Sequence, residues 1–112
     1  MAPGLGLAWG DIRLVDFEQP DKRRPVLVLT RNSAIPVLHA ITVAPVTRTI
    51  RGIPTELRVG IAEGLKGESV VNLDSIQTVP KERVGRYLGS VAPNRKVDLR
   101  RALLFALDLD AE

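Results

Sequence analysis

The stretch that decides the fold is RRPVLVLT, residues 23–30. Residues 26–29 form the apolar run VLVL, which fits a strand buried on both faces better than a strand with one solvent-exposed face. Other short segments rich in Val, Ile, Leu and Thr lie on both sides of it, separated by Pro, Gly and Asn. They span residues 12–17, 40–46, 55–59, 69–73 and 85–91. The pattern therefore predicts a β-rich fold in which residues 26–30 form a central strand.

The segment AITVAPV, residues 40–46, carries a proline near its end. Pro45 has no N–H to give to a β-ladder, so we expect this strand to lie at a sheet edge or to end where Thr47 begins. Either arrangement would expose the Thr47 hydroxyl. The following segments 51–54 and 60–68 are rich in turn residues and are predicted to be loops.

One helix is predicted, from about Pro93 onward. Pro93 suits a first helical turn, and the apolar residues that follow recur at helical spacing. These are Leu99, Ala102, Leu103, Ala106 and Leu107. A shorter helical turn fits residues 80–84, with Pro80 at its start and Gly85 after it. Strands followed by a helix indicate an α+β fold, with the helix packed on a curled sheet.

The length of the chain favours a single domain, and its net charge favours a polyanionic partner. The 112 residues fit a single domain, 1–112, with 1–8 as a flexible N-terminus. Sixteen Lys and Arg against thirteen Asp and Glu give a net charge of +3, which favours an anionic partner. The chain has no cysteine, which excludes disulfides and suits a reducing compartment. No segment reaches the roughly twenty apolar residues of a membrane helix, so we expect a cytoplasmic protein without membrane contact.

The catalytic options are narrow. His39 is the only histidine, so one subunit cannot use a two-histidine mechanism of proton exchange. No spacing of Asp, Glu and His repeats a metal-binding pattern on one element. We therefore predict no metal and no cofactor.

Arg24 and Thr47 are the pair that points to phosphate chemistry. An arginine at the start of one strand and a hydroxyl at the end of another can meet at one rim of a small barrel. The guanidinium is always charged, and its planar fork of donors matches two phosphate oxygens. It can therefore stabilise the charge that builds on a five-coordinate phosphorus. The alternatives are a solvated arginine and an ordinary threonine at a strand end.

Four segments in order make the chain resemble the MazF/PemK family of toxin endoribonucleases. They are GDIRLVDF (10–17), the Arg24-Pro25 step into VLVL, VAPVT (43–47) and SVVNLDSIQTV (69–79). The resemblance runs from about Gly10 to about Leu107. It implies a small SH3-like (CcdB/PemK-type) antiparallel β-barrel with a C-terminal α-helix, in which Arg24 is catalytic and Thr47 holds the scissile phosphate or the attacking hydroxyl.

The same resemblance suggests Asp74, ahead of Glu18, as the base that removes the proton from the attacking ribose hydroxyl. The alternatives are that a water molecule takes this proton, and that Asp74 only holds Arg24 or a base edge in place or is a surface carboxylate at a strand end. In the PemK branch an arginine two residues before this aspartate is the acid, but here that position is Asn72, which carries no cationic proton. The loop EQPDKR (18–23) is shorter than in many relatives, so the cut-site sequence cannot be transferred. We expect RNA contacts from Phe17, Glu18, Arg48, Asn72, Ser75 and Gln77. Trp9 and Tyr87 are further aromatics able to stack on a base.

The resemblance implies sequence-selective, metal-independent cleavage of single-stranded RNA, mRNA in particular, by attack of the 2′-hydroxyl. The products would be a 2′,3′-cyclic phosphate and a 5′-hydroxyl. It also implies a homodimer and a MazE-like antitoxin whose acidic tail occupies the RNA groove. Two alternatives remain open: a CcdB-like toxin that binds gyrase, and an inactive relative that binds RNA without cutting it.

Overall fold

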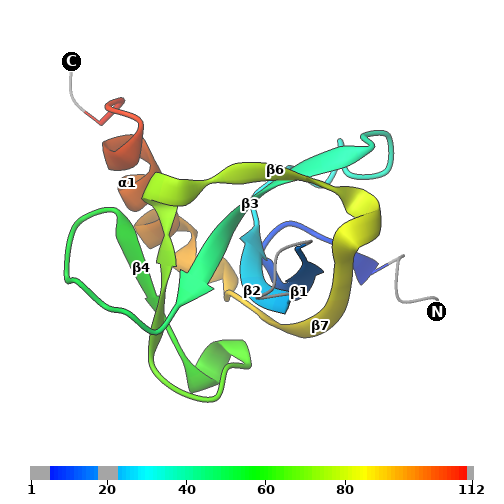
Figure 1. Cartoon of the computed structure of the whole chain (residues 1–112). Coiled ribbons are helices and arrows are strands. Elements are labelled where there is room, and N and C mark those ends of the chain that lie inside the picture. Colours follow the sequence, from blue (N-terminus) through cyan, green and yellow to red (C-terminus); the bar gives the residue numbers. More distant parts are fainter. Residues whose placement is uncertain (1–5, 18–22, 111–112) are drawn as a thin grey trace.

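The computed structural model describes residues 6–17 and 23–110, and its one α-helix packs against a strongly curled antiparallel sheet (Figure 1). The strands of the sheet follow the order β4-β5-β3-β2-β1-β7. The remaining strand, β6, lies outside this order and pairs with β3. The strands are β1 (Asp11–Asp16), β2 (Arg23–Val28), β3 (Ala40–Thr47), β4 (Glu56–Val59), β5 (Ser69–Asn72), β6 (Gln77–Pro80) and β7 (Val84–Ser90). The predicted α+β fold of a small antiparallel β-barrel with a C-terminal helix is confirmed, and the curled sheet forms a half-barrel.

Strand β2 is central, as the apolar run predicts. It pairs with β1 on one side and β3 on the other, and its side chains enter two separate hydrophobic clusters. Leu27 packs in the first cluster, beneath the helix, whereas Val26 and Val28 pack in the second, on the opposite face. All three are fully buried. The run VLVL therefore has no polar position because neither face of the strand meets water.

Strand β3 is not at an edge, so that part of the expectation for Pro45 is wrong. β3 pairs with β2 along one side, and Pro45 lies opposite Val26. Along its other side β3 changes partner: β6 pairs as far as Val43, and β5 pairs from Val46. Pro45 falls in the gap between these two partners, where a missing ladder donor is tolerated. Strand β3 does end at Thr47, as expected.

The C-terminal helix is confirmed. Residues Pro93–Arg95 form a single 3₁₀ turn that leads into α1 (Lys96–Ala106). Leu99 and Ala102 are buried in the first cluster. The expected turn after Pro80 is the short 3₁₀ segment Lys81–Arg83. None of the helices in the described part of the chain is long and apolar enough to cross a membrane. Residues 1–5 of the predicted flexible N-terminus lie outside the described residues, while Leu7 packs against the second cluster.

The loop between β4 and β5 is clamped onto β7. It contains the 3₁₀ turn Ile61–Glu63, which ends at Gly64 in the left-handed region with φ 92°. A side-chain carbon at Gly64 would collide with the carbonyl of Leu88, and one at Gly89 would collide with the carbonyl of Glu63. The two backbones thus touch where only glycine fits. This contact fixes the position of the loop that follows, at residues 64–66.

Candidate nucleic-acid interface

Arg24 and Thr47 lie side by side on neighbouring strands. Val26 of β2 is opposite Pro45 of β3, and the same antiparallel register continued by two residues brings Arg24 opposite Thr47. Both residues line two adjoining clefts, which also share Val46. Arg24 is exposed and Thr47 is partly buried. The structure therefore brings together the two residues that sequence reasoning singled out for phosphate chemistry.

The larger cleft, of about 630 Å³, is cationic, and we call it the basic arm. Arg48 follows Thr47 at the end of β3, Lys66 comes from the loop between β4 and β5, and Arg86 comes from β7. All three side chains belong to exposed residues. No carboxylate among the described residues lines this arm. Cations that gather in a cleft lined by no described carboxylate suit a phosphate backbone.

The smaller cleft, of about 270 Å³, is lined by groups of mixed polarity, and we call it the polar arm. Beyond Arg24 and Thr47 it is lined by Thr49, Arg51, Glu56 and Asn72, together with Pro45 and Val46. The backbone N–H of Thr49 donates to the Thr47 hydroxyl oxygen at 3.1 Å. That bond occupies one acceptor site of the oxygen and leaves the O–H of Thr47 available to donate to a ligand.

Asp74 lines neither arm. It lies in the 3₁₀ turn Leu73–Ser75, where its Oδ2 accepts a hydrogen bond from the Thr55 hydroxyl at 2.6 Å. Its backbone N–H donates to Oδ1 of Asn72 at 2.9 Å. The bond from Thr55 ties the turn to the segment before β4. The carboxylate that does line the cleft is Glu56, which sequence reasoning missed.

The comparisons with known proteins agree with this architecture. Residues 8–107 match the family of PemK-like, MazF-like toxins of type II toxin-antitoxin systems. The chain belongs to this family.

Similar proteins include MazF endoribonucleases of Mycobacterium tuberculosis. Endoribonuclease MazF3 is 42% identical over 99 residues, which cover 88% of this chain and 96% of that protein. The solved structure of the M. tuberculosis toxin MazF-mt6 superposes with a TM-score of 0.83 at 40% identity, covering 90% of this chain and 99% of that one. A mycobacterial endoribonuclease solved in complex with its cognate antitoxin gives a TM-score of 0.83 at 29% identity, covering 96% and 100%.

The other RNA-binding candidates of this MazF-like chain divide between the cleft and its surroundings. Arg48 lines the basic arm and Asn72 the polar arm. Ser75 accepts a hydrogen bond from Asn72 Nδ2 at 3.2 Å, next to the cleft. Gln77 is exposed at the start of β6, and Phe17 packs against the second hydrophobic cluster. Glu18 lies outside the described residues.

Among the aromatics, Tyr87 is the one that reaches the cleft. It lines the basic arm and is 53% exposed, with the Arg13 guanidinium 5.5 Å from the centre of its ring. Trp9 instead packs on the core beside α1, with the Lys96 ammonium over its ring. Tyr87 is therefore placed to stack on a base, and Trp9 is not.

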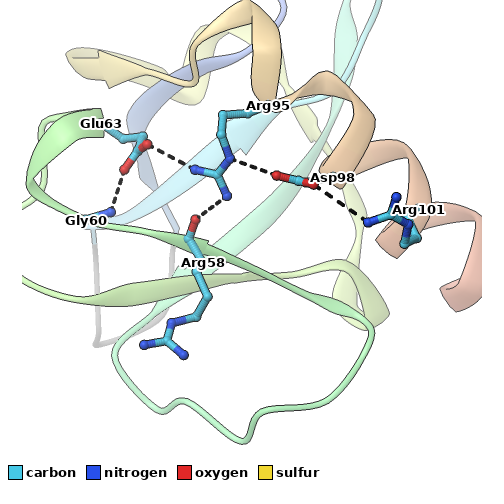
Figure 2. Close-up of polar contacts among 6 residues, drawn as sticks. All are labelled: Arg58, Gly60, Glu63, Arg95, Asp98 and Arg101. Carbon is cyan, nitrogen blue, oxygen red and sulfur yellow. Dashed lines mark hydrogen bonds and ion pairs between the residues drawn. The ribbon is translucent and has the colours of Figure 1, made fainter.

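An ion-pair network holds the loop that carries Lys66 (Figure 2). Glu63 accepts hydrogen bonds from the Gly60 backbone at 2.6 Å and from Arg95 at 3.2 Å. Arg95 also donates to the carbonyl oxygen of Arg58 at 2.7 Å and to the carboxylate of Asp98 at 3.2 Å. Arg95 thus ties α1 to β4 and to the loop at once. The position of Lys66 in the basic arm therefore depends on Arg95, a residue outside the cleft.

Several of these cleft residues carry no sequence signal of their own. Lys66, Arg86 and Glu56 are charged residues on three different elements, and each alone looks like a solvated charge. Their shared place in the cleft follows from the pairing of strands far apart in the chain.

The described residues contain no candidate metal site. Within residues 6–17 and 23–110, no three His, Asp or Glu side chains form a cluster that could hold a metal ion.

Proposed function

We propose that this chain is the toxin endoribonuclease of a type II toxin-antitoxin system, cleaving single-stranded RNA, including mRNA, at selected sequences without a metal ion. The observation that carries the proposal is the register that sets Arg24 beside Thr47 in a cleft continued by three further cations. Membership of a family of such toxins supports it, as do relatives named MazF endoribonucleases.

The reaction is a transesterification within the RNA. The ribose 2′-oxygen forms a bond to the adjacent phosphorus as its proton leaves, and the bond from phosphorus to the 5′-oxygen breaks. The leaving oxygen takes up a proton from a water molecule, which gives a 2′,3′-cyclic phosphate and a 5′-hydroxyl end. Arg24 stabilises the charge on the non-bridging oxygens, and the Thr47 O–H donates to one of them. A water molecule accepts the proton, while Asp74 keeps its neighbouring turn in place.

The same cleft is the site for the partner proteins. An acidic segment of a MazE-like antitoxin would neutralise the toxin by covering the basic arm, since carboxylates and phosphates seek the same arginines. A relative has been solved in complex with its cognate antitoxin, which supports an antitoxin as a partner of this chain. The chain works as a homodimer. Competition tests whether the site is shared: RNA should displace a bound antitoxin segment, and the displacement is measured by fluorescence anisotropy.

A cleavage assay tests the proposal. The purified chain is incubated with a long single-stranded RNA in the presence of a chelator, and both new ends are mapped. We expect Arg24→Ala and Thr47→Ala each to slow cleavage by about a hundredfold or more. Arg100→Ala, which removes an exposed cation from α1, is the charge-matched control and should leave the rate unchanged.

Two outcomes of that assay would contradict the proposal. Full activity in both cleft variants would move the site elsewhere, and cleavage at a position carrying a 2′-deoxyribose would exclude the 2′-hydroxyl mechanism. RNA binding without cleavage by the unaltered chain would identify it as an inactive relative. Inhibition of gyrase supercoiling in the absence of any RNA cleavage would favour the CcdB-like alternative.

A further inference from the structure

Glu56 is a carboxylate inside a cleft that is otherwise suited to phosphate. It lines the polar arm together with Arg24 and Thr47, and it is the acidic residue that does so among those the structure describes. A negative charge repels an RNA backbone, so a phosphate is not its partner. Its partner in bound RNA must instead offer N–H or O–H donors, because an ionised carboxylate only accepts hydrogen bonds.

The carboxylate is held in a fixed orientation. The backbone N–H of Arg51 donates to both oxygens, at 3.1 and 3.2 Å, and the N–H of Gly52 donates to Oε1 at 2.9 Å. Oε2 receives only the longer of these bonds, so it keeps acceptor capacity for a ligand. Glu56 is partly buried, and the three hydrogen bonds from its two backbone donors reduce the entropy lost when a ligand binds.

The sheet register places Glu56 beside the scissile phosphate rather than on it. Glu56 of β4 lies opposite Asn72 of β5. Val71 lies opposite Val46, so continuing that register by one residue brings Asn72 opposite Pro45 of β3. Glu56 is therefore two strands away from β3, roughly 10 Å at the usual strand spacing. This offset from the phosphate held by Thr47 suits the base of a neighbouring nucleotide.

Resting on the proposed nuclease function, we propose that Glu56 is a specificity-determining residue that reads the base next to the cut. Its carboxylate accepts a hydrogen bond from the exocyclic amino group of adenine, cytosine or guanine, as carboxylates do with the cytosine amino group. Uracil has no amino group, and its one ring N–H donor on that edge lies between two carbonyl oxygens that repel a carboxylate, so uracil is disfavoured there. In single-stranded RNA such edges are accessible. Asn72, adjacent to Glu56, presents an amide to the same base.

The two arms thus have different tasks. The basic arm, with Arg48, Lys66 and Arg86, grips the backbone and is indifferent to sequence. The polar arm selects the sequence through fixed acceptors and donors. This division predicts that charge changes in the basic arm alter affinity for all RNAs alike, whereas a change at Glu56 alters which RNAs are cut.

The test is a cleavage-site profile on an RNA pool with random bases around the cut, for the unaltered chain and Glu56→Gln. The amide keeps one oxygen acceptor, removes the charge and adds an N–H₂ donor. We expect the unaltered chain to disfavour uracil at one position next to the cut, and the variant to lose or reverse that preference. One hydrogen bond to a charged group contributes about 1.5–3 kcal/mol, so the change in relative kcat/KM should be roughly 10- to 150-fold. Glu68→Gln, an exposed carboxylate outside both arms, should leave the profile unchanged.

Substrate analogues give the second readout. Replacing the selected base by its analogue without the amino group should lower kcat/KM for the unaltered chain and have little further effect in Glu56→Gln. Equal loss of rate on every sequence, with an unaltered site profile, would overturn base reading. Gly52→Ala strains the same turn at φ 72°, where nothing crowds the added carbon, and it leaves the carboxylate in place. If this variant reproduces the changed profile, the turn and not the carboxylate sets the preference.

The two proposals fail separately. Absence of any RNA cleavage by the unaltered chain would remove the nuclease function itself. Cleavage with uracil accepted equally at every neighbouring position would leave the nuclease intact and overturn the role of Glu56.

Discussion

Replacing Arg95 by alanine should destabilise the fold and loosen the cleft, although Arg95 lies outside both arms. The substitution removes three hydrogen bonds, to the carboxylates of Glu63 and Asp98 and to the carbonyl oxygen of Arg58 (Figure 2). The Glu63 side chain is only 9% exposed. It would keep its bond from the Gly60 backbone but lose its cation.

The expected magnitude follows from the burial of the pair. Removing one partner of a fully buried pair costs about 3–5 kcal/mol, but the Arg95 side chain is 25% exposed, so we expect about 2–3 kcal/mol after discounting for solvent. An unfolding entropy of about 2.1 cal/mol/K per residue over 112 residues converts this to a fall in Tm of about 9–13 °C.

The assay is thermal unfolding by calorimetry at matched protein concentration, with a double-mutant cycle. Glu63→Gln keeps a hydrogen-bonding group without the charge. The double variant should therefore lose less free energy of unfolding than the two single variants lose together, by about 1–2 kcal/mol. Arg101→Ala is the control, because its pair with Asp98 is long at 3.8 Å and exposed and should contribute less than about 1 kcal/mol.

A functional readout separates positioning from stability alone. Below its Tm, the Arg95→Ala variant should show a higher KM for RNA with a nearly unchanged kcat. The loop that carries Lys66 would be displaced, which weakens RNA binding, whereas Arg24 and Thr47 would keep their positions on β2 and β3. A fall in Tm of less than about 2 °C, or additive effects in the cycle, would refute the reasoning.

Three further outcomes are expected. Gly89→Ala should prevent folding or destabilise it by more than about 3 kcal/mol in urea unfolding, because the added carbon meets the backbone of the neighbouring turn, whereas Gly67→Ala, with open space around it, should be tolerated. Lys66→Ala should weaken RNA binding about equally for all sequences and make the slope of log K against log salt shallower by about 0.7, measured by anisotropy titrations. Asp74→Asn should cleave RNA within a few-fold of the unaltered rate while Thr47→Ala does not, because Asp74 lies outside the cleft and asparagine keeps an acceptor oxygen; a hundredfold loss would restore Asp74 as a proton acceptor.

Strand β6 shows where local patterns stop being informative. Residues Gln77–Pro80 carry one buried side chain, Val79, between exposed neighbours, and no apolar run marks them as a strand. They become a strand because β3 is longer than its pairing with β5, so Ala40–Val43 of β3 have a free side with which β6 pairs. The same long-range pairing explains why Pro45 is tolerated inside β3.

The sequence alone predicted an α+β fold, a central strand at residues 26–30, a helix from about Pro93, the family resemblance, and Arg24 and Thr47 as a pair. These follow from burial, which imposes apolar runs and helical spacing on neighbouring residues. The tertiary structure alone decided that Glu56 enters the cleft, that Asp74 stays outside it, and that Lys66 is held there through Arg95. Each of these depends on strand register and on the curl of the sheet, which join residues distant in the chain and leave no periodic trace in it.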